Sequence, residues 1–471
     1  MSTVPRGSLR ELFGPATRAL VLAGLGASFL ASFDLLIVVS ALPSAARDVG
    51  DIDNYALAAG AYSVASVVGM PIAGIVNDRI GPFRTLLVGS GVFFVGTVIG
   101  GTATSMDQIA AGRLLQGFGG GFLLSVPLVI WTAYLPRHLE RYGFAVNAAV
   151  WAISAVIGPP IGALLVALVD WRAVFWVNLP LLALTLLFTV RGFKGRPFTP
   201  HPQARANILG PVLLGGFALA LLLPSPWPVI SLPFALAFLW QETHTDRPLI
   251  PRHRSGYATC IVALSAGVAF TGGTTVITLA LQAGSGWSVF WASFPLLVSS
   301  LTWTIGTGLV THLDWPLRRI VTLGTVIVAA GTLVMAIPVS SGLAIAIGFM
   351  ISGFGMGFAS PALFPAALSD DEGREGRDTS AVTTARQLGA GIGAALAGFV
   401  LIETVPEAVL RAAEDGQAPL PELHDAAGMA FGLLGLIVLL SLPATRAIRV
   451  TPRRTRSAPG EAPAAATTPG G

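Results

Sequence analysis

The segment GIVNDRIGPFRT (74–85) aligns without gaps on the segment GLVTHLDWPLRR (308–319). Identical residues in the two segments are Gly74 and Gly308, Val76 and Val310, Pro82 and Pro316, and Arg84 and Arg318. A second pair, GRLLQGFGGGF (112–122) and GFMISGFGMGF (348–358), aligns glycines and phenylalanines at nearly the same offset. Self-similarity at a fixed offset is the signature of an internally repeated architecture. The sequence therefore predicts two similar halves.

The composition indicates that lipid is the solvent for most of the chain. Charged residues make up 11% of the 471 residues, against about 25% in soluble globular proteins. Hydrophobic residues make up 53%, and the mean hydropathy is +0.74. These values exclude an ordinary soluble enzyme and predict a polytopic membrane protein.

Apolar runs long enough to cross a bilayer recur along the chain. A spanning helix needs about 20 mostly apolar residues. Fourteen runs begin near residues 19, 56, 85, 107, 143, 173, 207, 227, 257, 288, 319, 342, 380 and 428. The runs at 207–223 and 227–241 are short and separated by prolines, so we expect a hairpin there. The runs are continuous rather than alternating, which excludes a membrane β-barrel and predicts an all-α fold.

The 28 Lys and Arg residues predict the orientation of these spans. With fourteen spans, both termini lie on one side, and nearly all of the basic residues fall on that side. Only Arg47, Arg172 and Arg411 fall on the other side. The positive-inside rule therefore predicts cytoplasmic termini and a location in the cell membrane. The first run extends beyond the length of a signal-peptide core, so we expect an uncleaved helix.

The position of the repeat predicts how the spans are grouped. Eight spans separate the two copies, so two halves of six helices flank an inserted pair. The expected parts are a cytoplasmic N-terminus (1–18), a six-helix bundle (19–195), a two-helix hairpin (205–241), a second six-helix bundle (257–447) and a disordered cytoplasmic tail (450–471). We expect the loop at 404–427 to be irregular, with one short helix. Parallel repeats are typical of transporters that rock one bundle against the other.

The repeat also separates architectural residues from informative ones. Glycines recur in both halves, so we interpret them as residues for close helix packing. Three positions differ in a way that packing does not require: Arg113 faces Phe349 in the other copy, Gln116 faces Ser352, and Pro159 faces Ala390.

Asp34 is the most informative residue, because it lies in the apolar run ASFLASFDLLIVVSALP, past the middle of the first span. A charged carboxylate near the middle of a membrane costs about 2.5 to 3.5 kcal/mol on insertion scales, and removal from water favours the protonated form of a carboxyl group. Such a group can load a proton on one side and release it on the other. The alternative is a carboxylate that is permanently paired to hold helices together.

Arg113 is expected at a depth similar to that of Asp34, because it lies about six residues into the fourth span, which runs in the opposite direction. The two side chains can therefore form a pair. Protonation of Asp34 would weaken that pair and release the arginine, a local event that can bias a two-state transporter. The alternative is an arginine that snorkels to the outer interface.

Two further segments are candidates for conformational control. Asp78, Arg79 and Arg84 follow the second span and can form a cytoplasmic ion-pair latch; ordinary loop charges are the alternative. In the fifth span, GPPIG permits close helix contact and a kink, with a purely structural kink as the alternative. The residues of this segment are Gly158, Pro159, Pro160 and Gly162.

No pattern indicates a metal, a redox centre or a nucleotide. The single cysteine, Cys260, has apolar neighbours, and the histidines show no metal-binding spacing. GFGGGF lacks the lysine and the strand of a phosphate-binding loop. We therefore expect no cofactor, no metal and no nucleic-acid partner.

Together, these motifs resemble those of the major facilitator superfamily, in its fourteen-span drug:proton antiporter group. FDLLIVVSALP resembles the first-span signature of that group, SAVIGPPIGA its fifth-span antiporter motif, and DWRAVFWVNLP its segment before the sixth span. The loop motif of the superfamily matches Gly74, Asp78, Arg79, Gly81 and Arg84, and the fourth-span motif matches Arg113, Gln116 and Gly117. Ser154 and Ala163 replace two glycines of the antiporter motif. Pro82 and Phe83 replace basic residues of the loop motif, which weakens the expected latch.

The resemblance implies two six-helix bundles with two extra central helices, and proton coupling through Asp34, Arg113 and Gln116. The expected protein is a monomeric exporter of lipophilic or amphipathic molecules, with protons and membrane lipids as its other partners. Candidate cavity residues, chosen by position and type, are Trp131, Trp151, Phe270, Gln282 and Trp303.

Three other functions compete with this interpretation. The nearest is a lipid or glycolipid exporter on the same fold. A membrane-embedded acyl- or glycosyltransferase needs an acid/base or metal cluster that the sequence lacks, so we expect no enzyme. A transport-dead sensor is disfavoured because Asp34 and Arg113 are both retained.

Overall fold

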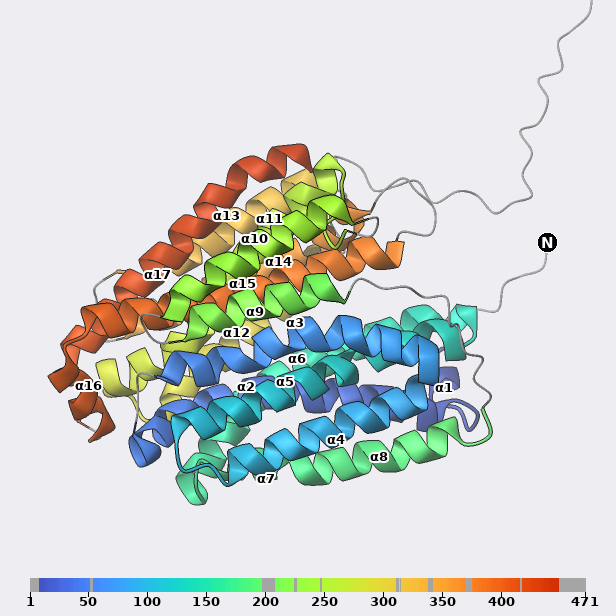
Figure 1. The fold of residues 1–471 in the computed structure, drawn as a ribbon, viewed down its shortest axis with the longest axis horizontal. Coiled ribbons are helices and arrows are strands. Elements are labelled where there is room, and N and C mark those ends of the chain that lie inside the picture. Colours follow the sequence, from blue (N-terminus) through green and yellow to red (C-terminus); the bar gives the residue numbers. More distant parts are fainter. Residues whose placement is uncertain are drawn as a thin grey trace, which may run out of the picture.

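The computed structural model describes residues 8–50, 54–196, 208–223, 227–245, 248–310, 313, 315–337, 342–368, 375–415 and 417–448. These residues form α-helices with short 3-10 and π turns and no strand (Figure 1). The first seven residues, the start of the expected hairpin and the tail at 450–471 lie outside the described residues, so the predictions made for them are not addressed.

Twelve helices of the described chain are long and apolar enough to cross a membrane. In the first half they are built from α2 (Arg18–Val49), α3 (Tyr55–Ile80), α4 (Pro82–Gly101), α5 with η2 (Met106–Val129, Ile130–Tyr134), α6 (Arg137–Leu168), and α7 with α8 (Ala173–Trp176, Asn178–Phe193). In the second half they are built from α11 with η4 (Arg254–Leu279, Ala280–Gly284), α12 (Val289–Val310), α13 (Leu317–Met335), α14 (Leu343–Ala367), α15 (Glu375–Thr404), and α17 with η5 (Pro421–Ser441, Leu442–Ala447). The predicted all-α membrane fold is confirmed.

The two helices of the inserted pair are shorter than a spanning helix, so the structure does not confirm fourteen spans. α9 (Leu209–Leu222) and α10 (Ser231–His244) have 14 residues each, which corresponds to about 21 Å of α-helix against a hydrocarbon core of about 30 Å. The apolar runs in the sequence include residues beyond the ends of these helices, and the last turn of α10 is polar. α9 packs against α3 and α15, so it contacts both halves.

Two short helices and the 3-10 turn η3 (Trp227–Ile230), which precedes α10, complete the described elements. α1 (Leu9–Leu12) precedes α2, and α16 (Glu407–Glu414) lies between α15 and α17, within the loop for which one short helix was expected. α16 lies at the end of the molecule opposite the N-terminus (Figure 1).

The apolar core is divided at the end of the molecule that carries the termini and continuous at the opposite end. Near the termini, one cluster contains first-half residues such as Leu20 and Phe193, and a separate cluster contains second-half residues such as Val262 and Phe358. At the opposite end, a single cluster combines residues of both halves, such as Ile37 of α2 and Ala394 of α15. The two bundles accordingly diverge towards the side of the termini (Figure 1).

Contacts between α3 and α15 locate the point where the bundles separate. Gln387 donates a hydrogen bond of 2.9 Å to Ser66, near the middle of both helices. Further from the termini, Gly391 approaches Val64, and Gly60 approaches Ala394. The structure therefore represents a state that is closed on the side opposite the termini.

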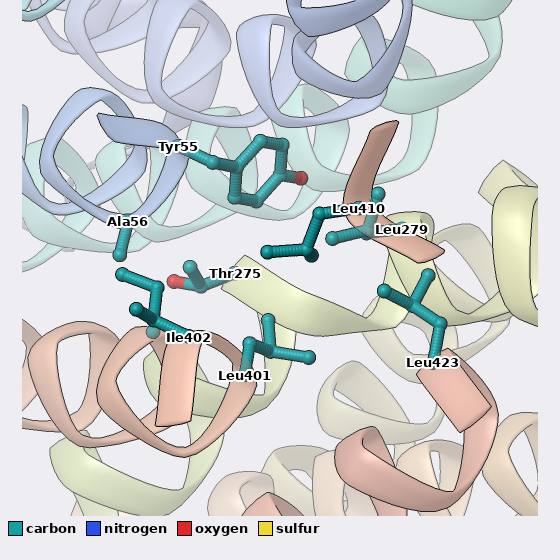
Figure 2. A pocket seen from close by; sticks show the side chains of 9 residues that line it. Tyr55, Ala56, Thr275, Leu279, Leu401, Ile402, Leu410 and Leu423 are labelled. Atoms are coloured by element: carbon teal, nitrogen blue, oxygen red, sulfur yellow. The ribbon is translucent and has the colours of Figure 1, made fainter. Parts of the chain in front are cut away.

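That closed end contains a narrow pocket between the two halves. Its walls come from α3, α11, α15, α16 and α17 (Figure 2). The lining is apolar apart from Tyr55 and Thr275, and it includes Leu410 of the short helix α16. α16 thus covers the bundle interface at the end opposite the termini.

Candidate functional site

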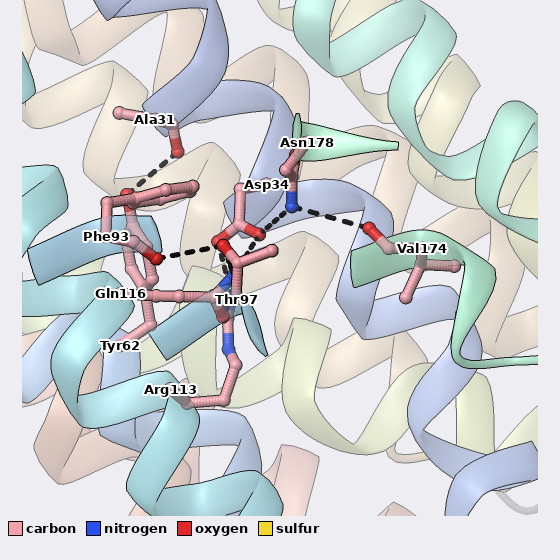
Figure 3. A network of polar contacts seen from close by, with 9 residues as sticks. All are labelled: Ala31, Asp34, Tyr62, Phe93, Thr97, Arg113, Gln116, Val174 and Asn178. Atoms are coloured by element: carbon pink, nitrogen blue, oxygen red, sulfur yellow. Dashed lines mark hydrogen bonds and ion pairs between the residues drawn. The ribbon is translucent and has the colours of Figure 1, made fainter. Parts of the chain in front are cut away.

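Asp34 lies at the centre of a polar network inside the first half (Figure 3). Arg113 donates through Nη1 to Oδ2 of Asp34 at 2.6 Å, and Gln116 donates through Nε2 to Oδ1 at 2.9 Å. Asn178 donates through Nδ2 to the same Oδ1 at 2.6 Å. The Asp34 side chain is 0% exposed and the Arg113 side chain 1%. Three donors from α5 and α8 thus converge on one carboxylate of α2.

A second layer of contacts holds the Arg113 and Gln116 side chains. The Arg113 guanidinium lies over the ring of Tyr62, 4.5 Å from its centroid, a favourable cation–π position. The Tyr62 hydroxyl donates to the carbonyl oxygen of Ala31 at 2.9 Å. Gln116 also donates to the Thr97 hydroxyl at 3.2 Å and accepts from Arg113 at 3.3 Å. α2, α3, α4, α5 and α8 therefore meet at this site.

The glycines of α5 explain how these helices approach closely enough. A Cβ on Gly112 would lie 2.8 Å from the backbone nitrogen of Gly100 in α4, and a Cβ on Gly117 would collide with the Tyr62 backbone in α3. Small residues let membrane helices pack backbone to backbone. The segment GRLLQGFGGGF thus places Arg113 and Gln116 opposite Asp34, and its glycines leave room for the backbones of α3 and α4.

The network is matched to an ionised carboxylate. An ionised carboxylate only accepts hydrogen bonds, whereas a protonated one also carries an O–H donor. Three donors occupy three of about four acceptor sites of the Asp34 carboxylate, and a proton on the remaining site of Oδ2 would add an O–H group that needs an acceptor. Two buried atoms of the network have no partner in the described structure, Nε of Arg113 and Oδ1 of Asn178. Protonation must therefore be accompanied by rearrangement of Arg113, Gln116 or Asn178.

The structure brings together all three residues that the sequence assigned to proton coupling, and it adds three more. Asn178, Tyr62 and Thr97 were not singled out from the sequence. Asn178 lies within DWRAVFWVNLP, where an asparagine at the start of a span is typical of a helix cap. The sequence signal for Asn178 is a polar residue inside an otherwise apolar run. Tyr62 and Thr97 gave no such signal, because tyrosine and threonine are common in membrane helices.

The GPPIG segment of α6 packs directly against α2, beyond Asp34. A Cβ on Gly162 would lie 2.7 Å from the carbonyl oxygen of Ile37, and one on Gly158 would lie 3.3 Å from Cβ of Leu36. α6 remains one continuous helix through Pro159 and Pro160. The expected close contact is present, and it lies within two turns of Asp34.

The comparison with family models decides the classification. The model described as Major Facilitator Superfamily matches residues 24–394, which is most of the chain. The chain belongs to the major facilitator superfamily. It is therefore a transporter.

Relatives of the chain include proteins named for multidrug resistance, multidrug transport and lipid transport. "Multidrug resistance protein 3" of Bacillus subtilis is 27% identical over 410 residues, covering 82% of this chain and 80% of the relative. "Multidrug transporter protein MdtP" of the same species is 26% identical and covers 82% and 75%. "Triacylglyceride transporter" of Mycolicibacterium hassiacum is 30% identical over 283 residues, covering 55% and 52%.

Solved structures confirm the major facilitator fold. A peptide transporter POT in complex with sulfate has a TM-score of 0.66 at 16% identity, covering 95% of this chain and 98% of the other. At this identity the likeness concerns the fold alone.

The loop motif of the superfamily is not latched in this state. Among the described residues, no ion pair involves Asp78, Arg79 or Arg84. Gly81 ends α3 with a φ of 83°, a conformation that glycine adopts without strain. Gly74 has no atom within 4 Å of an added Cβ. The motif lies at the end where the two bundles have diverged.

Of the five candidate cavity residues of this transporter, Phe270 and Trp303 are in contact with each other. Phe270 stacks on Phe349 with ring centroids 5.1 Å apart and meets Trp303 edge-on at the same distance. Trp131 is 0% exposed in the first-half core. Gln282 accepts a hydrogen bond from Arg47 at 3.3 Å at the closed end, and Trp151 is partly buried on α6. A shared cavity for all five stays a prediction.

Metal-binding chemistry has no candidate in the described part of the chain. No group of three or more His, Cys, Asp or Glu side chains there could hold a metal ion. Cys260 is a buried free thiol.

Proposed function

We propose that this transporter is a proton-coupled exporter of lipophilic or amphipathic small molecules, with Asp34 as its proton carrier. The observation that carries the proposal is the convergence of three hydrogen-bond donors on a fully buried carboxylate inside one bundle. A structural ion pair needs only Arg113. The additional amides of Gln116 and Asn178 make the geometry depend on the charge of Asp34.

The coupling follows from what a proton does to this network. Protonation of Asp34 removes the negative charge that holds Arg113 and replaces one acceptor site by a donor. Arg113 then loses its buried counter-ion, which is costly in a low-dielectric interior. The first bundle relieves this cost by shifting α2, α5 and α8 relative to one another. Because α2 also contacts α11 of the second half, the shift reaches the bundle interface.

The direction of transport follows from the predicted orientation. With the termini in the cytoplasm, the state described above is open inward and closed outward. The unpaired Asp78, Arg79 and Arg84 fit this state, because a latch between the bundles at the cytoplasmic end forms only when that end closes. The substrate then enters from the cytoplasmic side or the inner leaflet, and a proton that enters from outside drives its release outward.

The nature of the cargo has two candidates. The multidrug resistance protein and the multidrug transporter of Bacillus subtilis support lipophilic small molecules. The relative named for triacylglyceride transport, 30% identical over about half of its length, supports a lipid cargo. Both cargoes use the same alternating access and the same carboxylate.

The test is transport by purified protein in proteoliposomes with an imposed pH gradient. We expect gradient-driven movement of a lipophilic dye in the wild type and its loss in Asp34→Asn. The matched control is Asp107→Asn, which removes an exposed carboxylate in the first turn of α5. Equal transport by wild type and Asp34→Asn, with or without the gradient, would overturn proton coupling through Asp34. A labelled triacylglyceride in the same assay separates the two cargoes.

A further inference from the structure

Arg386 is a membrane-embedded cation that the proposed mechanism does not use. It is the twelfth residue of the 30-residue helix α15, and its side chain is partly exposed. No hydrogen bond or ion pair of the described residues involves it. Ionisable residues inside a membrane protein mark functional sites by default, because their burial is costly.

No carboxylate lies within two turns of Arg386 on its own helix. Residues 379–402 contain no Asp or Glu, and Asp378 lies eight residues earlier, about 12 Å along the helix axis. The other charged residues of α11 to α17 lie near helix ends. Asp34, the carboxylate in the middle of the first half, is already paired with Arg113. The site around Arg386 therefore carries a net positive charge.

The position of Arg386 is the point where the two bundles separate. Its neighbour Gln387 makes the hydrogen bond to Ser66 that joins α15 to α3. Its backbone carbonyl lies against Gly267 of α11, where an added Cβ would collide with it. Long side chains on a helix lean towards the N-terminal end of that helix, and α15 begins on the side of the termini. The Arg386 side chain therefore leans towards the side of the termini, where the bundles diverge.

Aromatic surface lies one turn of α11 beyond the contact between Gly267 and Arg386. Phe270 follows Gly267 by one turn of α11, is partly exposed, and is fixed by its contacts with Phe349 and Trp303. A guanidinium offers planar, paired donors that suit a carboxylate or a phosphate. The Phe270 ring, one turn further along α11, offers an apolar surface. The two together fit a molecule with an anionic group and an apolar body.

We propose that the cargo is an anionic amphiphile, whose carboxylate or phosphate binds Arg386 while its apolar body packs against Phe270. This inference rests on the proposed export function and narrows its cargo. A positive site disfavours lipophilic cations, which carry the wrong charge for it. The anionic group can belong to a lipophilic acid or to an anionic lipid, because both present the same chemistry to the guanidinium.

The test uses three fluorescent probes with one tail and different ends: a carboxylate, a primary amide and a quaternary ammonium. Equilibrium binding to protein in nanodiscs of neutral lipid is measured separately from transport in proteoliposomes. We expect the wild type to bind the carboxylate probe at least tenfold more tightly than the ammonium probe. Arg386→Gln should lose that preference while binding of the amide probe changes less than twofold. Arg386→Lys should retain part of it.

Controls separate this inference from the export function. Arg446→Gln removes an exposed arginine in η5 and should leave the preference unchanged. Because binding needs no gradient, failure of Asp34-dependent transport leaves the binding result interpretable. A preference of the wild type for the ammonium probe, no binding of the carboxylate probe, or an equal loss of all three probes in Arg386→Gln would overturn the proposal. Comparison of the transport rates of a labelled anionic phospholipid and of the carboxylate probe distinguishes a lipid cargo from a lipophilic acid.

Discussion

Asn178 donates a 2.6 Å hydrogen bond to Asp34, from a helix that lies 144 residues later in the chain. Both side chains are fully buried. The bond connects the start of α8 to the middle of α2. The Oδ1 atom of Asn178 has no partner in the described structure. When Asp34 is protonated, its new O–H needs an acceptor, and rotation of the Asn178 amide presents this free oxygen to it. Asn178 thus can serve both charge states of the carboxyl group.

The first prediction concerns Asn178→Leu, which keeps a similar volume but removes the amide. The lost bond goes to a charged group, for which a contribution of about 1.5 to 3 kcal/mol is typical. We expect a lower thermal stability and a pH profile of transport that differs from that of the wild type. The measurements are thermal unfolding in detergent and transport rate against pH.

The matched control for Asn178 is Asn147→Leu. Asn147 accepts a hydrogen bond of 2.6 Å from Ser28, also between two helices of the first half. Both partners there are neutral, so the expected loss is about 0.5 to 1.5 kcal/mol, with an unchanged pH profile. Identical pH profiles for Asn178→Leu and the wild type would show that Asn178 only supports the structure.

The second prediction concerns the Asp34–Arg113 pair. Removing one partner of a buried ion pair leaves an uncompensated charge and costs about 3 to 5 kcal/mol, whereas replacing both partners is often neutral. We expect Arg113→Leu to be strongly destabilised and Asp34→Leu/Arg113→Leu to recover much of the stability without gradient-driven transport. Thermal unfolding and proteoliposome transport measure the two effects. A double variant as unstable as Arg113→Leu would show that the two residues do not act as a pair.

The sequence predicted the charged part of the site because charge stands out against lipid-facing residues. Asp34 and Arg113 each interrupt an apolar run, and comparison of the two repeats separated Arg113 and Gln116 from the recurring glycines. Asn178 was harder to predict, because a polar residue at the start of a helix is equally typical of a cap. Arg386 was not singled out from the sequence, because it lies near the start of the run at 380, between Thr384 and Gln387, and was counted with the basic residues on the side of the termini.

The sequence also predicted the all-α membrane fold. It did not predict the exact extent of the inserted helices or the conformational state, and both have physical causes. Hydropathy counts apolar residues whether or not they form regular α-helix, so the runs at 207–223 and 227–241 include residues outside α9 and α10, among them the 3-10 turn η3 (Trp227–Ile230). It also carries no information about the conformational state. The two states of an alternating-access transporter use the same helices and differ in which ends of the bundles pack together. Only the three-dimensional packing, such as Ser66 against Gln387, identifies the closed end.

The third prediction tests the packing of α6 on α2. A Cβ on Gly162 would lie 2.7 Å from the carbonyl oxygen of Ile37, so Gly162→Ala must push the helices apart close to Asp34. We expect at least a tenfold loss of transport. Gly91→Ala is the control, because no atom lies within 4 Å of a Cβ at Gly91, and it should retain the wild-type rate. Normal transport by Gly162→Ala would mean that this helix contact is not needed.

The fourth prediction tests the closed end of the bundle interface. A Cβ on Gly60 of α3 would lie 3.0 Å from Cβ of Ala394 in α15, close to the separation of about 3.5 to 4.5 Å that a disulfide bridges. In a Cys260→Ser background, we expect the pair Gly60→Cys and Ala394→Cys to cross-link under mild oxidation. The linked protein cannot open its outward end, so transport should stop and return on reduction.

Single-cysteine variants control for oxidation elsewhere in this last experiment. The cross-linking yield also reports the conformational equilibrium. If Asp34 controls that equilibrium, Asp34→Asn, which mimics the neutral carboxyl group, should change the yield, whereas Asp107→Asn should not. Full transport activity in the cross-linked protein would contradict alternating access through this interface. An unchanged yield in Asp34→Asn would instead separate the proton site from the movement of the bundles, because the charge of Asp34 would then have no influence on which end is closed.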